Sequence, residues 1–418
     1  MLRASALYIV IIIALVVATL CSSMIVAAYF YKLQYQRKFR LERLQNNLES
    51  GISLILSSDS NYYSEKKINL FYQQEDTISI EKISWGFFDV GIVKAYFQRD
   101  TLYKSFSIAS AIDSLKWASI YLVDEERPLY VSGKTYIKGT AYLPKSGIKE
   151  SYVEGNSYEG DKRLIIGDKK ESKEILPVLK TSRINYLRMN KESFLNSDSS
   201  FRGKIIKNSF LNPAMKFYFK NVSKNVSNIN LEGNIILFSE NGITLDSTCI
   251  LNNVLVFAKS IQVRNGFKGS AQLFATESII VGKNCVFNYP SGMGVLKTDT
   301  KTNIQPKIVI GDSCVFKGIL FSYEKVKSDA QTLIDLGKDV RIEGEVFSKG
   351  MIRFKNGVTI YGGISANRII YETKSTLFEN YLVNTTINLD LLSPYYLTSN
   401  VFSGASNKRK VLEWLGTK

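Results

Sequence analysis

A regular repeat of apolar residues in the second half of the chain constrains the fold more than any other feature. Stepping back from Cys285 to every eighteenth position reaches Phe267, Cys249 and Leu231, all of them apolar. The phrases VGKNCVF and IGDSCVF, at 281–287 and 310–316, repeat the same order of residues. Short β-rich segments that recur at a fixed period are typical of solenoids, in which equivalent side chains stack. We therefore predict a parallel β-solenoid with about 18 residues per coil.

The period predicts which side chains form the interior of this solenoid. After Cys285, the next two members of the series are Cys314 and Val340, and each is more than 18 residues from the one before it. In both cases the extra residues fall in a polar stretch of the sequence. On this interpretation the cysteines are small apolar core residues, and a free thiol site is the alternative. The predicted core column is Leu231, Cys249, Phe267, Cys285, Cys314, Val340 and Val358. Neighbouring columns are predicted at Leu237, Leu255 and Leu273, at Ile243, Ile261 and Ile279, and at Leu245, Val263 and Val281.

The N-terminus predicts a membrane anchor. No charged residue occurs from Ala4 to Tyr31, and this run exceeds the roughly 20 apolar residues that cross a bilayer. A cleaved signal peptide would have a shorter apolar region, so we expect an uncleaved span. The basic residues that follow would contact lipid head groups, and by the positive-inside rule they favour a cytoplasmic C-terminal part. This membrane-surface cluster comprises Lys32, Arg37, Lys38, Arg40 and Arg43.

The helix is predicted to continue beyond the span as an amphipathic rod. Leucine and isoleucine recur at three- and four-residue intervals from Leu41 to Ile55. A charge-free helix led by the residues MLRA and running into an amphipathic half resembles the N-terminus of type IV pilins and minor pseudopilins. That resemblance implies an extracytoplasmic globular part. Two departures are a short leader and Ile9, which stands where most pilins carry glutamate if Ala4 ends the leader.

The pattern along the chain predicts four segments. Residues 1–57 form the anchor and amphipathic helix, and 58–128 a small β or α+β region. Residues 129–370 form the β-helix, with a polar insertion at about 171–226 and an early coil at 129–144. Residues 371–418 form a C-terminal cap or flank, where Val411, Leu412, Trp414 and Leu415 have helical spacing. The glycine-cornered coils resemble those of bactofilins, which implies end-to-end assembly without nucleotide.

Composition excludes several classes of function. The chain has no histidine, which removes Ser/His/Asp and Cys/His nucleophiles and most zinc chemistry. The four cysteines show no CxxC spacing, and acidic residues near the repeats are scattered. We therefore expect no catalytic residues, no metal and no cofactor, and predict a non-enzymatic structural or interaction protein of a cell-envelope assembly, pilin-like or secretion-related. Alternatives are a cytoplasm-facing bactofilin-like scaffold polymer and a β-helix protein that binds or degrades polysaccharide.

Charge indicates the classes of partner. The formal net charge is +16, which favours anionic surroundings. The expected partners are the lipid bilayer, other protein subunits of the assembly and an anionic polysaccharide. Nucleic acid is not expected, because the basic residues are spread along the chain and match no base-reading module. The expected location is a single-pass membrane protein with most of the chain outside the cytoplasm, the cytoplasmic orientation remaining open.

Overall fold

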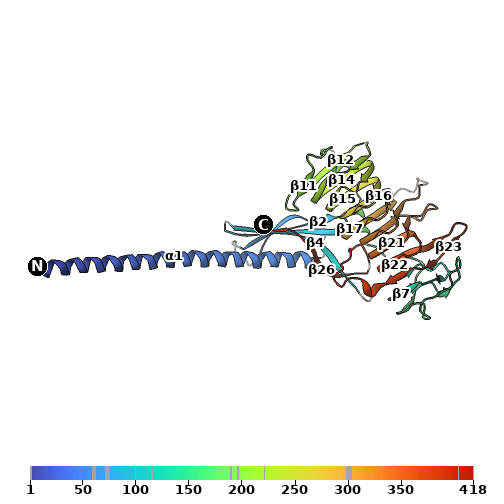
Figure 1. Ribbon diagram of the computed structural model, residues 1–418, viewed down its shortest axis with the longest axis horizontal. Helices are drawn as coiled ribbons and strands as arrows, with labels where there is room; N and C mark the ends of the chain where they lie inside the picture. Colours follow the sequence, from blue (N-terminus) through green and yellow to red (C-terminus); the bar gives the residue numbers. More distant parts are fainter. Residues whose placement is uncertain are drawn as a thin grey trace. The chain divides into compact units, whose positions relative to one another are not determined.

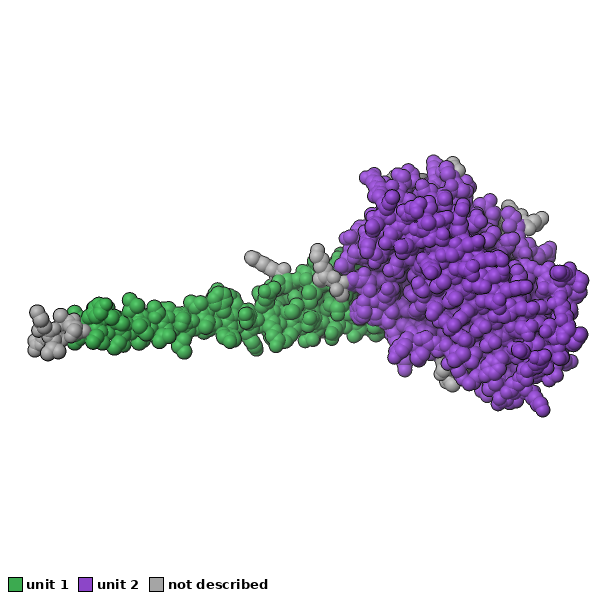
Figure 2. Space-filling view, viewed as in Figure 1, with its two compact units in different colours: residues 1–82, 91–104, 417–418 green, residues 83–90, 105–416 purple. Residues whose placement is uncertain are grey.

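The computed structural model divides the chain into two compact units. It describes residues 2–58, 63–70, 76–98, 100–113, 116–188, 191–194, 197–220, 222–297, 304–402 and 404–417. Unit 1 consists of 1–82, 91–104 and 417–418, and unit 2 of 83–90 and 105–416 (Figure 2). The division falls within strands, so several strands contribute residues to both units.

The long helix α1 spans Leu2–Ser57 and has two different halves. Its apolar part is fully exposed, and this is the one helix among the described residues that is long and apolar enough to cross a membrane. The second half buries Leu44, Leu48, Ile52 and Ile55 within unit 1, whereas Leu41 stays 46% exposed. The predicted amphipathic rod is therefore confirmed from Leu44 onward.

Close packing in unit 1 depends on Gly51, at the centre of the buried helix face. A Cβ atom at this position would lie 2.6 Å from Cγ1 of Val93 and 3.2 Å from Cδ1 of Ile78. Because real Cβ atoms do not approach this closely, only glycine lets the helix lie so near these strand residues. A polar contact adjoins this apolar packing, since Arg43 of the helix forms an ion pair with Asp76.

A five-stranded sheet has the order β1-β2-β3-β4-β26. The last strand corrects the helix that was predicted for the C-terminal tail. Ser105 and Ser107 donate hydrogen bonds to carbonyls of this strand, and the rings of Phe106 and Trp414 lie 5.6 Å apart. Pairing with a partner strand thus outweighs the weak helical spacing of the tail. The strands are β1 (Tyr63–Asn69), β2 (Thr77–Trp85), β3 (Phe88–Phe97), β4 (Asp100–Ile112) and β26 (Ala405–Thr417).

The rest of unit 2 is dominated by parallel strands that pair one after another, which we call the parallel stack (Figure 1). Its long strands are β14 (Asn230–Leu245), β15 (Ile250–Val263), β16 (Lys268–Val281), β17 (Val286–Lys297), β19 (Val315–Glu324), β21 (Arg341–Phe354) and β22 (Thr359–Glu372), and the short strands β18 (Lys307–Ile310) and β20 (Leu333–Leu336) lie between them in the chain. Shorter pieces are β5 (Ile120–Leu122), β6 (Leu129–Ser132), β7 (Tyr136–Lys138), β8 (Ala141–Leu143), β9 (Ile148–Glu150), β10 (Lys169–Glu171), β11 (Ile205–Asn208), β12 (Met215–Phe219), β13 (Lys224–Val226), β23 (Leu377–Glu379), β24 (Tyr381–Val383) and β25 (Thr386–Asn388). Short helical turns are α2 (Thr181–Tyr186), η1 (Lys191–Phe194) and η2 (Leu389–Leu391).

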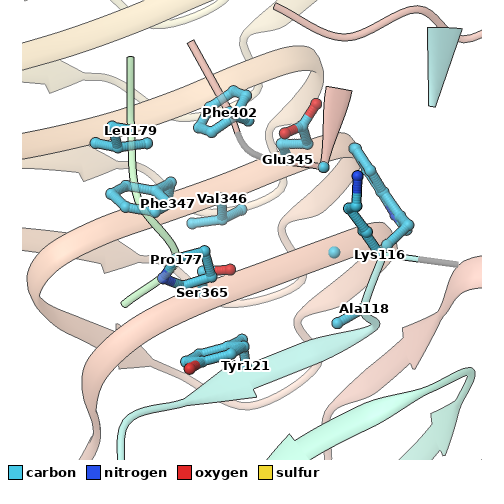
Figure 3. Close-up of a pocket in the computed structure, with 13 residues that line it drawn as sticks. Lys116, Ala118, Tyr121, Pro177, Leu179, Glu345, Val346, Phe347, Ser365 and Phe402 are labelled. Carbon is cyan, nitrogen blue, oxygen red and sulfur yellow. The ribbon is translucent and has the colours of Figure 1, made fainter. Parts of the chain in front are cut away.

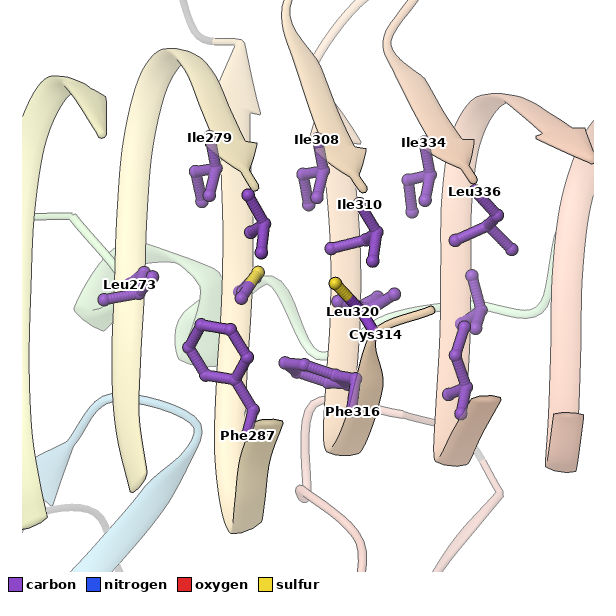
Figure 4. Packing of buried hydrophobic residues seen from close by; sticks show 14 of the residues in the cluster. Leu273, Ile279, Phe287, Ile308, Ile310, Cys314, Phe316, Leu320, Ile334 and Leu336 are labelled. Atoms are coloured by element: carbon purple, nitrogen blue, oxygen red, sulfur yellow. The ribbon is translucent and has the colours of Figure 1, made fainter. Parts of the chain in front are cut away.

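Register within the stack follows the predicted period where the strands are regular. Ile261 lies opposite Ile279, and Ile342 lies opposite Ile360. Two predicted columns, Ile243–Ile261–Ile279 and Leu245–Val263–Val281, are in register. Because neighbouring strands bury equivalent isoleucine, leucine and valine side chains, one continuous apolar core runs through the stack (Figure 4).

The spatial order of the paired strands differs from their order in the sequence. β5 pairs with β22, with Ile120 opposite Ile364, and β7 pairs with β25. The early coil predicted at 129–144 therefore lies at the end of the stack beyond β22. Within the predicted insertion, β11, β12 and β13 pair with β14 and form the coil at the opposite end.

These observations confirm the coarse fold prediction. The protein is mainly β, with one long apolar N-terminal helix and a large parallel sheet. The four predicted segments stay a prediction.

Candidate functional site

The predicted core column lies inside the stack. All seven of its residues are at most 1% exposed and belong to one core cluster. Backbone hydrogen bonds from Val286 to Phe267, from Val315 to Cys285 and from Arg341 to Cys314 place successive members opposite one another. Cys314 and Phe316 point into the same interior as Phe287 (Figure 4).

The column is wrong at its first member. Leu231 lies opposite Leu251, and the amide of Ile250 bonds to the carbonyl of Ile229, so Ile229 takes the position opposite Cys249. Leu255 is also misplaced, because it pairs with Ile236 on the outer side while Val256 faces Leu237. Register shifts between Glu232 and Ile235 and between Ser239 and Gly242 cause both errors. A fixed period cannot anticipate such bulges.

The cysteines of the column are free thiols in an apolar setting. Burial raises the pKa of the Cys249 thiol to about 12. The Sγ atoms of Cys285 and Cys314 lie within 3.2 Å and 3.0 Å of the carbonyl oxygens of Arg264 and Gly282, to which they donate. A buried thiol with a raised pKa is a poor nucleophile, which applies to Cys249. The hydrogen bond with Cys314 lowers the pKa of Cys285 to about 7, so burial is what shields this thiol from reagents.

The predicted membrane-surface cluster is divided between solvent and unit 1. Lys32, Arg37 and Lys38 are exposed. Arg40 lies 3.4 Å from Asp100, and Arg43 forms a two-point pair with the buried carboxylate of Asp76. Arg40 and Arg43 are therefore corrected to residues held by acids of unit 1, and a role of Lys32, Arg37 and Lys38 as head-group contacts stays a prediction.

Sequence reasoning missed an aromatic column on the outer side of the stack. Strand neighbours alternate between faces, and the residues just before these aromatics belong to the core, so the aromatic rings face outward. The repeated phrase leucine or valine, phenylalanine, then serine or alanine, at 237–239, 256–258, 273–275, 320–322 and 346–348, would have revealed it. The column runs in register through Tyr218, Phe238, Phe257, Phe274, Gly294, Phe321, Phe347, Ser365, Tyr121 and Tyr142.

The described residues of one segment, 172–188 and 191–194, cover this aromatic column, and we call them the strap. At one end, the Tyr121 hydroxyl donates to the carbonyl of Ile175 at 3.1 Å. At the other, the Phe194 ring lies 5.0 Å from that of Phe238. Between them, Arg183 is buried in an ion pair with Asp89 and donates to the carbonyl of Gly86 at 2.9 Å. The strap therefore crosses the stack from the β10 end to the β11 end.

Phe87 completes the aromatic column where Gly294 leaves a gap. Its ring lies 5.1 Å from Phe274 and 5.8 Å from Phe321. Its amide donates to Oε1 of Gln272 at 2.7 Å, and Ser399 donates to its carbonyl at 2.6 Å. The turn at 86–88 is thus fixed onto the stack by both apolar and polar contacts.

A cavity of about 70 Å³ lies between the strap and the stack at Glu345. Figure 3 shows Pro177 and Leu179 of the strap on one side and Glu345 and Lys116 on the other. Burial raises the pKa of Glu345 to about 8, although Thr398 and Tyr396 donate hydrogen bonds to its carboxylate. A carboxyl with this pKa is largely neutral at pH 7 and can itself donate a hydrogen bond.

The indole of Trp117 also lines this cavity. Its Nε1–H has no hydrogen-bond partner among the described residues, although the side chain is only 7% exposed. Gly363 makes room for the indole, because a Cβ there would lie 3.4 Å from Nε1 and 2.4 Å from the carbonyl oxygen of Ala118. The cavity thus combines an unpartnered donor with a neutral carboxyl, which suits water or a small polar molecule.

Two larger spaces lie along the same covered face. One, of about 430 Å³, is bordered by Ile175 and Val178 of the strap and by Glu324 and Lys349 of the stack. The ammonium of Lys349 lies 4.7 Å above the ring of Tyr323. The other, of about 490 Å³, has an apolar floor formed by Phe238, Phe257 and Phe274. Among the described residues, no cluster of three or more acidic or cysteine side chains could hold a metal ion.

Comparisons with known proteins do not identify a family for this chain. No family model matches the chain, and no curated protein matches it by sequence. Among solved structures, the competence-associated pilin ComZ from Thermus thermophilus is matched at 9% identity over 85% of this chain and 87% of that chain, with a TM-score of 0.23. A TM-score this low does not establish a common fold. The bactofilin resemblance finds no support in these comparisons.

Proposed function

We propose that this protein is a non-enzymatic, membrane-anchored structural or interaction protein of a cell-envelope assembly, of a pilin-like kind. One observation carries the proposal: α1 has an exposed apolar half followed by a half that is buried in unit 1. An exposed apolar helix of this length is stable in a bilayer or against the same helix of other subunits. The buried half fixes unit 1 rigidly to that anchor.

We further infer that the parallel stack is a β-solenoid whose role is to present binding surfaces. In support, strands β14, β15, β16, β21 and β22 recur at or near the predicted period and share one core. Stability in such a fold accumulates coil by coil, without a metal or a disulfide. The lack of histidine favours a binding role over a catalytic one, because it removes the commonest general base.

Two measurements test the anchor and its orientation. N-terminal sequencing of the mature protein should find a new terminus at Ser5 if the pilin-like interpretation is right, whereas an intact Met1 favours a plain anchor. For orientation, an exposed residue of the 373–376 turn can be labelled in a Ser375→Cys, Cys21→Ala variant. A membrane-impermeant maleimide should label it in intact cells, with the buried cysteines as silent internal controls.

A cytoplasm-facing scaffold is the second candidate, favoured by the exposed basic residues Lys32, Arg37 and Lys38 after the span. In that case Ser375→Cys would be labelled only after the membrane is permeabilised. Labelling that needs permeabilisation would contradict the pilin-like proposal and support this alternative.

A further inference from the structure

We propose that the coil at the β11 end of the parallel stack binds an anionic polysaccharide. The observation behind it is the distribution of charge: residues 202–231 contain six basic residues and no acidic one. Positive charge is therefore concentrated at this end of the stack. We call these residues the basic rim: Arg202, Lys204, Lys207, Lys216, Lys220 and Lys224.

The basic rim surrounds an end of the stack and not a side. Strands β11, β12 and β13 each pair with β14, and the one other described pairing of this coil is the bridge from Asp198 to Phe217. Phe201 closes the core at this end, with its ring 4.9 Å from that of Phe217. A polymer lying across the end could therefore meet side chains from all three strands at once.

Two members of the rim, Lys204 and Lys220, are exposed and form no ion pair with any described residue. Lys207 lies 2.6 Å from Glu232 and Arg202 lies 3.6 Å from Asp198, so a polyanion would compete with these carboxylates for them. The ammonium of Lys224 lies 5.4 Å from the Phe201 ring, which holds the side chain over the closed end. Fixed cations around a rigid rim bind a flexible polyanion with less loss of side-chain freedom than free lysines do.

The surroundings favour polysaccharide over nucleic acid. The aromatic rings on the strands of this coil are buried and cannot stack on bases, and the half-buried Phe201 ring lies under the ammonium of Lys224. No helix is presented to a groove by this coil, since 205–226, as far as the structure describes it, is composed of strands and turns. The rim thus offers charge without base recognition. This inference depends on surface charge and not on the proposed anchor function, so either can fail alone.

The full-length protein in detergent provides the test, with binding to polygalacturonate measured against salt concentration. The variant K204Q/K207Q/K220Q should bind about tenfold more weakly or worse at low salt and show a shallower salt dependence. A matched control, K145Q/K149Q/K162Q, removes the same charge from exposed lysines at the opposite end of the stack and should change affinity less than about twofold.

Three outcomes would overturn the proposal. The first is an equal loss in both triple variants, which would mean that total charge alone matters. The second is binding to neutral dextran as tight as to polygalacturonate. The third is a clear preference for duplex DNA over polygalacturonate, which would assign the rim to nucleic acid. Unchanged circular dichroism and unfolding temperature in both variants ensure that the comparison reports on binding.

Discussion

The ring of Phe87 occupies the space beside Gly292 that any other residue at 292 would need. A Cβ atom at 292 would lie 2.4 Å from Cδ2 and 2.7 Å from Cε2 of Phe87. Gly292 and Phe87 are far apart in sequence, yet the glycine makes the slot that lets the turn at 86–88 dock on the stack.

Replacing this glycine should therefore loosen the docked turn. We expect Gly292→Ala to lower the free energy of unfolding by about 1–3 kcal/mol, since overpacking forces the Phe87 ring to move. Denaturant unfolding measures it. The same change in a Phe87→Ala background should lower the free energy of unfolding much less, because the clash is gone. Gly404→Ala is the control, since its Cβ would meet nothing closer than 3.5 Å. If the effects of Gly292→Ala and Phe87→Ala on the free energy of unfolding simply added, Gly292 would not be needed to make room for Phe87.

The thiols of the core column should be inert in the folded protein. In a Cys21→Ala variant, we expect no rapid reaction with a water-soluble thiol reagent under native conditions, because the other three cysteines are at most 1% exposed. Three equivalents should react after unfolding. Rapid native reaction at any of these three cysteines would instead support a free thiol site.

Glu345 should make stability depend on pH in a predictable direction. Its pKa in the folded protein is about 8, above the ordinary value of 4.5, because burial disfavours the charged form. The folded state therefore holds this proton more tightly than the unfolded state does. The contribution of Glu345 to the free energy of unfolding is fully present below about pH 4.5 and is lost as the pH rises to about 8.

Glu345→Gln should flatten that part of the stability profile, as measured by unfolding at a series of pH values. The control is Glu343→Gln, which neutralises a partly exposed carboxylate paired with Lys317 and Arg341 and should leave the slope between pH 5 and 8 in place. If Glu345→Gln left the profile unchanged, the pKa of Glu345 would not differ between the folded and unfolded states, and the prediction would be wrong.

The pair between Arg43 and Asp76 should fix α1 within unit 1. Asp76 is 1% exposed, and Arg43 and Asn47 both donate to its carboxylate, which holds its pKa below 3.8. Its contribution is present above the unfolded-state pKa and lost as the pH falls through the lower folded-state value. We expect Asp76→Asn to cost about 1–3 kcal/mol and to speed amide hydrogen exchange over residues 44–55.

Lys38→Gln is the comparison for this prediction. Lys38 and Glu42 form an exposed pair at 3.8 Å, with side chains 76% and 58% exposed. Exposed pairs of this kind contribute little, so the exchange rates should stay unchanged. Equal effects of the two variants would rule out a special role for the buried pair.

Periodicity in the sequence predicted much of the core, but it did not predict the register shifts or the strand formed by the C-terminal tail. The regular spacing placed Ile243, Ile261 and Ile279 correctly because inward side chains of regular strands must match their neighbours. It misplaced Leu231 and Leu255, since a bulge adds residues without changing the residue types around it. The tail was misread as a helix because its spacing carries no information about the distant strand β4 with which it pairs.

The covered outer face was equally present in the sequence but was not recognised. Phenylalanines 257, 274, 321 and 347 each come directly after a core residue, and each is at most 5% exposed only because other segments cover it. Which segment covers them depends on contacts such as Arg183 with Asp89, across 94 residues of sequence. No local pattern identifies partners at that distance. The polar composition of 171–226 suggested an insertion, whereas its residues 172–188 and 191–194 cover aromatic rings and its strands β11, β12 and β13 pair with β14.

The pairing of Ile120 with Ile364 has a consequence for how the chain reaches its native state. During synthesis, β5 leaves the ribosome long before β22, the strand with which it pairs. More than half of the chain has to be synthesised between the two strands. Contacts this remote slow folding, because a very long loop has to close before they form. Nascent chains truncated before residue 359 should therefore keep β5–β8 accessible to protease, even where the coils from β14 onward are already protected.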